Sequence, residues 1–132
     1  MIQRNPAIQF ASSDKIKVWQ EERLQEELIY LQEHSPFYSG LFRRAGVDPT
    51  AIRRIEELQQ LPVTTKEDLQ RHNEAFLCVP KREIVDYVTT SGTLGDPVTF
   101  ALTESDLQRL AYNEYLSFST AGINPHDIMQ LM

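Results

Sequence analysis

The sequence of 132 residues is poor in cysteine and has no long apolar run. Its single cysteine, Cys78, excludes an intramolecular disulfide framework and favours a reducing compartment. No apolar segment approaches the roughly 20 residues that a membrane-spanning helix requires. The first residues, Met1–Pro6, contain no apolar stretch typical of a signal peptide. We therefore expect a cytoplasmic protein with no membrane partner.

Basic residues are scarce in the second half of the chain. From Met1 to Pro62 there are eight Lys and Arg against nine Asp and Glu, whereas Val63–Met132 has five against ten. Beyond Gly95 the only basic residue is Arg109. Because nucleic-acid interfaces depend on a basic stripe that meets the phosphates, this charge distribution predicts no nucleic-acid partner.

Several catalytic and metal-binding patterns are also missing. The three histidines lie far apart, and none has a cysteine or carboxylate at metal-ligand spacing, so no metal site is predicted. Cys78 stands between two apolar residues and is interpreted as a buried apolar side chain, not a nucleophile. No Gly-x-Ser-x-Gly sequence is present, which argues against serine hydrolase chemistry.

Residues 1–83 show helical periodicity punctuated by proline. Ser35-Pro36 is expected to end the first helix, since a residue before proline is disfavoured in the α conformation. Thr65 and Asp68 have the spacing of a capping box, with Asp in place of the usual Glu or Gln. The pattern predicts four helices, in order: from the Ser12–Asp14 cap to His34, Phe37–Ala45, Asp48–Gln60, and one that begins at Thr64–Leu69.

The periodicity changes near residue 84, where β-branched and aromatic residues become frequent. We predict strands at 84–88 and 98–102, a helix capped at Thr103–Asp106, and a buried strand at 127–132. The fold class is therefore α/β (α+β within this fragment), with a helical region at 1–83 and the start of an α/β subdomain at 84–132. This order of elements opens a larger sheet, so we expect the N-terminal piece of a longer fold.

One loop, Thr89–Pro97, combines hydroxyl side chains and glycines between the two predicted strands. Its hydroxyl side chains are those of Thr89, Thr90, Ser91 and Thr93, and its glycines are Gly92 and Gly95. Glycines let the backbone approach a ligand closely, and consecutive N–H groups with nearby hydroxyls can bind an anion. The spacing excludes a Walker A motif and a dinucleotide-binding fingerprint. Two interpretations remain: a phosphate-binding loop, or a hairpin loop whose hydroxyls satisfy local backbone groups.

The loop resembles the Ser/Thr/Gly-rich phosphate loop of the adenylate-forming superfamily. The wider pattern resembles the N-terminal region of phenylacetate–coenzyme A ligases. The other matching segments, in the family's order, are Ser35–Tyr38, Ala45–Pro49, Glu57–Leu69 and Ala121–Asp127. The resemblance implies ATP, bound with magnesium in the complete enzyme, a carboxylic acid and coenzyme A as substrates. It also implies an acyl-adenylate intermediate and an acyl-coenzyme A thioester as product.

Carried over to this sequence, the resemblance assigns phosphate contacts to Ser91, Gly92, Thr93 and Gly95, with Thr90 beside them. It places no catalytic residue in this segment, so the 132 residues alone are expected to complete neither half-reaction. Leu94 and Asp96 stand where the family usually has a hydroxyl residue and a lysine. An aspartate there either weakens ATP binding by charge repulsion or points away from the phosphates.

A second hypothesis comes from a different functional class. In it the chain is a non-catalytic helical interaction or assembly module that has lost nucleotide binding, and the loop at 89–97 is only a hairpin connection. Its apolar faces would then serve a homodimer or association with the remainder of the longer fold. The hypotheses differ in their response to nucleotide, because only the first predicts protection of residues 89–97 by ATP.

Overall fold

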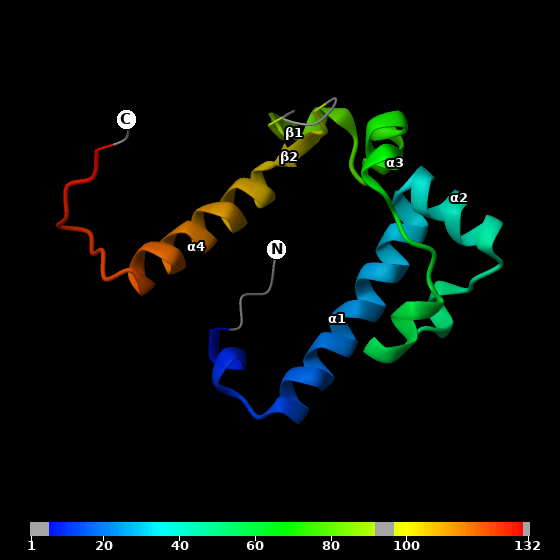
Figure 1. Ribbon diagram of the computed structural model, residues 1–132, viewed down its shortest axis with the longest axis horizontal. Coiled ribbons are helices and arrows are strands. Elements are labelled where there is room, and N and C mark those ends of the chain that lie inside the picture. Colours follow the sequence, from blue (N-terminus) through cyan, green and yellow to red (C-terminus); the bar gives the residue numbers. More distant parts are fainter. Residues whose placement is uncertain (1–5, 92–96, 131–132) are drawn as a thin grey trace.

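A computed structural model describes residues 6–91 and 97–130 of the chain. Within them, helices form the first part and a two-stranded hairpin followed by a helix forms the second (Figure 1). The α-helices and strands are α1 (Ser13–His34), α2 (Pro36–Ala45), α3 (Lys66–Arg71), β1 (Ile84–Thr89), β2 (Thr99–Thr103) and α4 (Glu104–Thr120). The 3₁₀ helices are η1 (Pro6–Phe10), η2 (Pro49–Ala51), η3 (Ile55–Gln60), η4 (Asn73–Phe76) and η5 (Lys81–Glu83). This arrangement confirms the predicted α+β fragment.

The first two helices follow the sequence prediction closely. α1 ends at His34, and Ser35 is at once its C-cap and the N-cap of α2. Ser12 occupies the N-cap position of α1, although its side chain makes no capping hydrogen bond. α2 ends at Ala45 and is capped by Gly46, whose φ of 66° lies in the left-handed region that glycine adopts without steric cost.

A small hydrophobic core joins α1, α2 and the segment that follows them. It consists of Leu28, Phe42 and Ile52, each only 3–4% exposed. Four partly buried side chains pack around it: Leu24, Leu31, Tyr38 and Leu61. Leu28 is the one buried residue of α1, so this long helix is held to the rest of the molecule along a narrow stripe.

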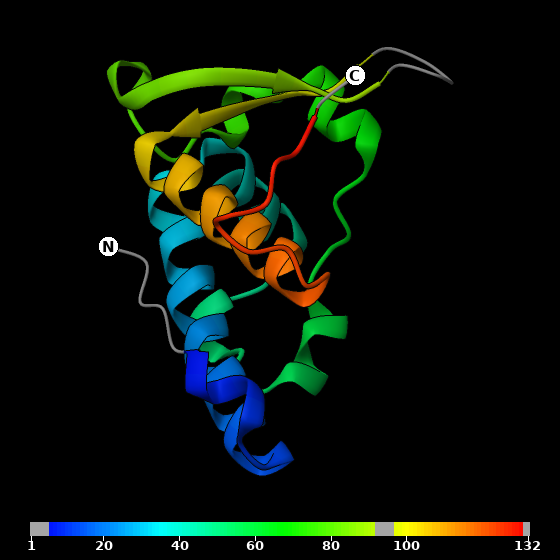
Figure 2. The ribbon, with the colours of Figure 1, turned by 90° about the vertical axis from the view of Figure 1, so that its left-hand side faces the viewer.

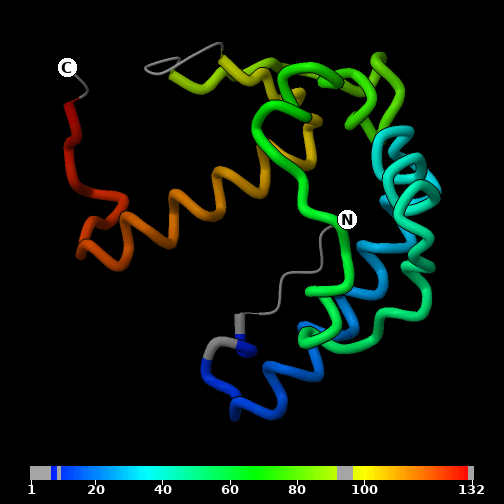
Figure 3. Tube along the Cα trace, turned by 45° about the vertical axis from the view of Figure 1, so that its right-hand side comes forward, coloured from blue at the N-terminus to red at the C-terminus, as the bar shows by residue number. Residues whose placement is uncertain are grey.

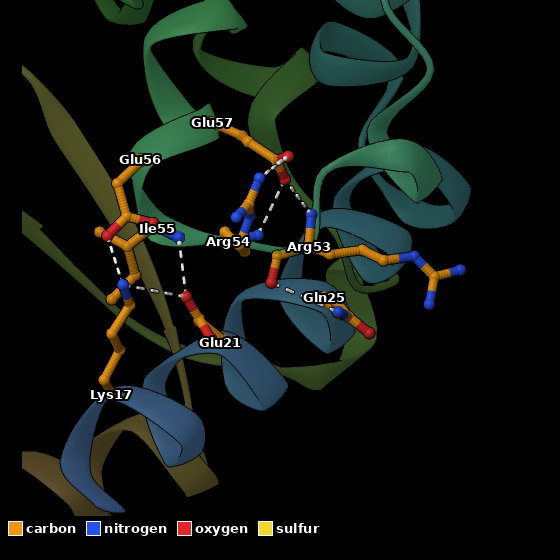
Figure 4. A network of polar contacts seen from close by, with 8 residues as sticks. All are labelled: Lys17, Glu21, Gln25, Arg53, Arg54, Ile55, Glu56 and Glu57. Carbon is orange, nitrogen blue, oxygen red and sulfur yellow. Dashed lines mark hydrogen bonds and ion pairs between the residues drawn. The ribbon is translucent and has the colours of Figure 1, made fainter. Parts of the chain in front are cut away.

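The helix expected from Asp48 to Gln60 is wrong. The chain forms η2 and η3 instead, and the backbone between them is extended at Ile52 and Arg54. This break places the Ile52 side chain in the core. It also frees backbone groups that polar side chains then satisfy, as Figure 4 shows.

The side chains that satisfy these backbone groups come from Glu57 and from helix α1. The Glu57 carboxylate accepts hydrogen bonds from the backbone N–H groups of Arg53 at 2.8 Å and Arg54 at 3.0 Å. From α1, Glu21 accepts from the N–H of Ile55, and Gln25 donates to the carbonyl of Arg53 (Figure 4). Burial of Ile52, the local bonds to Glu57 and the long-range bonds to α1 together stabilise this irregular segment, in place of the continuous helix that propensity favours.

β1 and β2 form an antiparallel hairpin, in which Tyr87 pairs with Ala101 and Val88 pairs with Phe100. Figure 2 shows the two strands side by side. α4 starts directly after β2, where Thr103 and Asp106 form a reciprocal capping box. The predicted hairpin and the capped helix after it are confirmed.

The second part of the molecule is open. α1 and α4 diverge from the region of the hairpin, as seen in Figures 1 and 3.

The buried strand predicted at 127–132 is wrong for the residues that the structure describes there. Residues 127–130 are exposed and have no strand beside them, Ile128 being 99% exposed. A strand forms only against a neighbour, and the described sheet contains β1 and β2 alone.

Candidate phosphate-loop site

The base of the loop at 89–97 is closed by two hydrogen bonds between Thr90 and Val98. The backbone N–H of Thr90 donates to the carbonyl of Val98 at 3.0 Å. The N–H of Val98 donates in turn to the Thr90 hydroxyl oxygen, also at 3.0 Å. Val98 is 3% exposed, so it anchors this end of the hairpin in the protein interior. Together these contacts hold the two ends of the loop at a fixed separation.

Asn73 attaches the same end of the hairpin to the helical region. Its side-chain amide donates to the carbonyl of Thr99 at 2.7 Å. Asn73 begins η4, so the contact joins a short helix before the hairpin to the first residue of β2. Sequence reasoning missed this residue, because a lone Asn 26 positions from its partner carries no local signal.

The structure places only part of the predicted site. Thr90 and Ser91 are described, and both are exposed at the end of β1. Thr90 already uses its hydroxyl oxygen to close the loop base. Gly92, Thr93 and Gly95 lie outside the described residues, as do Leu94 and Asp96. The structure therefore establishes how the base of the loop is held, and the phosphate contacts of the loop stay a prediction.

The segment Thr64–Leu69, which resembles the ligase pattern, has a structural role. Thr65 accepts from the N–H of Asp68 at 3.2 Å, and the Asp68 carboxylate accepts from the N–H and hydroxyl of Thr65 at 2.9 and 2.8 Å. These donors, the backbone N–H first, hold the pKa of Asp68 below its ordinary value of 3.8. The Thr64 hydroxyl reaches the Tyr38 hydroxyl at 3.4 Å. The helix cap predicted at Thr65 is confirmed.

A cleft of about 1040 Å³ lies elsewhere, between α1, the segment 76–79 and the start of α4. The Tyr30 hydroxyl donates to the carbonyl of Cys78 at 3.4 Å on its wall. Burial, together with the charge of Glu27, raises the pKa of the Cys78 thiol, which is therefore protonated at neutral pH. Cys78 is partly buried, less than the buried position that the sequence predicts for it.

Across 6–91 and 97–130, no group of three or more His, Cys, Asp or Glu side chains is arranged to hold a metal ion. In the same residues, no helix is long and apolar enough to cross a membrane.

Comparison with known proteins identifies relatives along most of the chain. The phenylacetate–coenzyme A ligase of Thermus thermophilus is 36% identical over 121 residues, which cover 91% of this chain and 27% of the relative. The phenylacetate–coenzyme A ligase of Escherichia coli is 35% identical over 122 residues, covering 91% and 28%. No protein-family model matches. The chain thus spans about a quarter of the length of these curated relatives.

A solved structure shares the fold. It is an open conformation of 2-hydroxyisobutyryl-CoA ligase in complex with 2-HIB-AMP and CoA, and it matches with a TM-score of 0.83 and 27% identity. The match covers 92% of this chain and 29% of that one. Helical region, hairpin and α4 therefore recur together, in this arrangement, as part of a larger molecule.

Proposed function

Because this chain is a homologue of part of the phenylacetate–coenzyme A ligases, we propose that it supplies the ATP phosphate-binding loop of a carboxylate–coenzyme A ligase. The observation that carries the proposal is the loop after β1, whose base is fixed by the paired Thr90–Val98 hydrogen bonds. A hydroxyl- and glycine-rich loop closed at a rigid base can present several backbone N–H groups to one anion.

The proposed reaction has two steps. A carboxylate oxygen of the acid bonds to the α-phosphorus of ATP, and the bond from that phosphorus to the pyrophosphate leaving group breaks. The thiol sulfur of coenzyme A then bonds to the acyl carbon, AMP leaves, and the thiol proton goes to solvent. We assign Ser91, Gly92, Thr93 and Gly95 to the β- and γ-phosphates, with Thr90 beside them. Donors placed there stabilise the negative charge that moves onto pyrophosphate.

Magnesium would enter such a site together with ATP, and no residue of this chain is assigned to it. We propose a small carboxylic acid as the acyl substrate. Support for the adenylate and for coenzyme A comes from the 2-hydroxyisobutyryl-CoA ligase structures that hold an acyl-AMP and CoA.

We further propose that the chain divides into two structural regions, a helical region at 1–83 and the start of an α/β subdomain at 84–132. The first holds the core of Leu28, Phe42 and Ile52, and the second holds the hairpin and α4. In this division the helical region is a support for the loop, because Asn73 attaches it to the first residue of β2. A cytoplasmic location fits the single cysteine and the intracellular supply of ATP and coenzyme A.

The test uses what we call the completed ligase: the full 132-residue chain joined to the part of the Escherichia coli ligase that this chain does not match. Hydrogen exchange is measured with and without MgATP, and pyrophosphate release is measured with phenylacetate and coenzyme A. We expect ATP to slow exchange at residues 89–97. We expect Ser91→Ala to lower pyrophosphate release about tenfold or more, since one lost donor to a developing charge costs at least that.

The matched control is Ser105→Ala, which removes an exposed hydroxyl from the first turn of α4. It should leave both measurements unchanged. Unaltered exchange at 89–97 in saturating MgATP, with no pyrophosphate released, would contradict the proposal and favour the assembly module.

A further inference from the structure

Asn73 bonds the helical region to the strand that leaves the loop at 89–97. Its side-chain amide donates to the carbonyl of Thr99 at 2.7 Å, and both residues are half-buried. Thr99 follows Val98, the buried residue whose N–H and carbonyl close the loop base on Thr90. The bond from Asn73 therefore holds the loop base from outside the loop, one residue beyond the bonds that close it.

The short helix η4, which Asn73 begins, is itself fixed to the helical region. The ring of Phe76, at its other end, stacks on Phe37 with centroids 3.9 Å apart and meets Tyr38 edge-on at 5.6 Å. Phe37 is 7% exposed, and Tyr38 packs against the hydrophobic core. One end of η4 is thus packed on α2, and the other end carries the amide that binds the hairpin.

Across residues 6–91 and 97–130, the helices that precede the hairpin pack mainly on one another and only lightly on β1 and β2, whereas α4 packs on β2. Large side chains of both strands are exposed, namely Tyr87, Val88 and Phe100. A two-stranded hairpin with so little packed on it is only marginally held in place. The Asn73–Thr99 bond therefore has a large share in fixing where the loop base lies relative to the helical region.

We propose that Asn73 is a positioning residue that sets the affinity of the loop for the phosphates of MgATP. The inference rests on the proposed function and adds to it a residue that acts through Thr99 and the loop base without touching the substrate. Backbone donors stabilise a phosphate only from hydrogen-bond distance, and a misplacement of about 1 Å can cost about a hundredfold. Because coupling between binding events is reciprocal, phosphates held by the loop must in turn stabilise η4.

Gln25 provides a matched control for Asn73. Its side-chain amide also donates to a distant backbone carbonyl, that of Arg53, at 3.5 Å, and Gln25 is likewise half-buried. This contact joins two parts of the helical region and does not involve the hairpin. Asn73→Ala and Gln25→Ala each remove one bond from an amide to a carbonyl, and only the first bond leads to the loop. Both variants are made in the completed ligase and in the 132-residue chain.

Pyrophosphate release by the completed ligase gives the first measurement. We expect Asn73→Ala to raise the KM for MgATP about fivefold or more and to leave the KM for phenylacetate within about twofold. Gln25→Ala should change neither value. A purely structural role lowers the amount of folded enzyme and hence the maximal rate, so the two KM values separate positioning from poor folding. A native KM for MgATP in Asn73→Ala would overturn the proposal, and so would an equal rise in both variants.

Hydrogen exchange in η4 gives the second measurement. The amides of Ala75 and Leu77 each donate to the carbonyl three residues earlier. In the native completed ligase and in Gln25→Ala, MgATP should slow exchange at these amides about fivefold or more, whereas in Asn73→Ala it should have no effect. If MgATP slows exchange at 89–97 and not at η4 in the native protein, the positioning role is overturned and the proposed function stands.

The same two amides test the bond without nucleotide. In the 132-residue chain alone, Asn73→Ala should speed their exchange about fivefold, since a lost hydrogen bond frees that end of η4, and Gln25→Ala should not. Equal exchange in Asn73→Ala and the native chain would overturn the proposal, because the bond would then hold nothing in place. A native completed ligase without any response to MgATP at 89–97, with this difference present, would overturn the proposed function and with it the positioning role, while the attachment of Asn73 to Thr99 would stand.

Discussion

The hydroxyl of Ser35 donates a hydrogen bond to the carbonyl oxygen of Ala75 at 3.2 Å. The same hydroxyl oxygen accepts from the backbone N–H of Tyr38 at 3.3 Å, so one side chain caps α2 and joins it to η4. Beside it the rings of Phe37 and Phe76 stack with centroids 3.9 Å apart. Ser35 therefore connects the turn between α1 and α2 to the segment that leads into the hairpin.

Replacing this hydroxyl should weaken the whole helical region. Ser35 is 1% exposed, so Ser35→Ala removes a helix cap and leaves the carbonyl of Ala75 without that donor. We expect the free energy of unfolding to fall by about 1–3 kcal/mol. Urea denaturation followed by circular dichroism measures this change.

Ser117→Ala is the control for Ser35→Ala, since Ser117 is exposed on α4. Its effect should stay within about 0.5 kcal/mol. Equal effects of the two substitutions would mean that the Ser35–Ala75 contact contributes nothing to stability.

The capping box of α3 should make the free energy of unfolding depend on pH. Donors from Thr65 hold the pKa of Asp68 below 3.8 in the folded protein, whereas in the unfolded chain it returns to its ordinary value. A folded-state pKa that is depressed adds stability above the unfolded pKa, and this stability is lost as the pH falls through the folded pKa. Asp68→Asn should therefore lower stability at about pH 6, and its difference from the native chain should shrink toward about pH 2.5.

Urea midpoints of the two proteins, measured across this pH range, check the prediction for Asp68. Glu67→Gln removes a neighbouring exposed carboxylate that is not part of the capping box. The difference in urea midpoint between Glu67→Gln and the native chain should vary less with pH. A difference between Asp68→Asn and the native chain that stays constant down to the lowest pH would show that the carboxylate charge is not what stabilises the cap.

Local signals in the sequence predicted the parts of the fold that depend on neighbouring residues. The capping box at Thr65, the helix cap at Thr103–Asp106 and the break at Ser35-Pro36 are each set by residues close together in the chain, and the structure confirms each. The helix expected from Asp48 to Gln60 was wrong for the opposite reason. Burial of Ile52 against α1 decides that segment, and no feature within the segment indicates its partner.

The candidate site likewise has features that the sequence predicts and contacts that only the folded chain makes. The loop at 89–97 was found from its hydroxyls and glycines, which are local features. The contacts that fix its base include Asn73 and the buried Val98, which only the folded chain brings together. Likewise, the strand expected at 127–132 was inferred from an apolar run, while strand formation depends on a neighbour that the described residues do not provide.

The Thr90 hydroxyl should be needed to keep the loop base closed. Thr90→Val keeps the shape of the side chain but removes the acceptor of the Val98 N–H. We expect faster hydrogen exchange at the Val98 amide and a local loss of about 1–3 kcal/mol, the cost of a polar group left without its partner. Thr90→Ser retains the hydroxyl and should behave like the native chain, and amides of α1 serve as an internal reference. Unchanged exchange at Val98 in Thr90→Val would contradict this role.

Charge at position 96 should control the affinity of the loop for ATP. Asp96 follows Gly95, one of the residues that we assign to the phosphates, and the chain beyond it has a single basic residue. A carboxylate near a polyphosphate repels it, so Asp96→Lys in the completed ligase should tighten MgATP binding by on the order of 1 kcal/mol or more, about fivefold. Asp96→Asn should give a smaller gain in the same direction, and both gains should decline with added salt. Glu22→Lys makes the same change in net charge on α1, where the side chain is exposed and far along the chain from the loop. Calorimetric titration of the three variants decides between the two interpretations of this residue. An equal effect of Asp96→Lys and Glu22→Lys would mean that the side chain at position 96 points away from the phosphates, and the repulsion would then be excluded as a cause of weak binding.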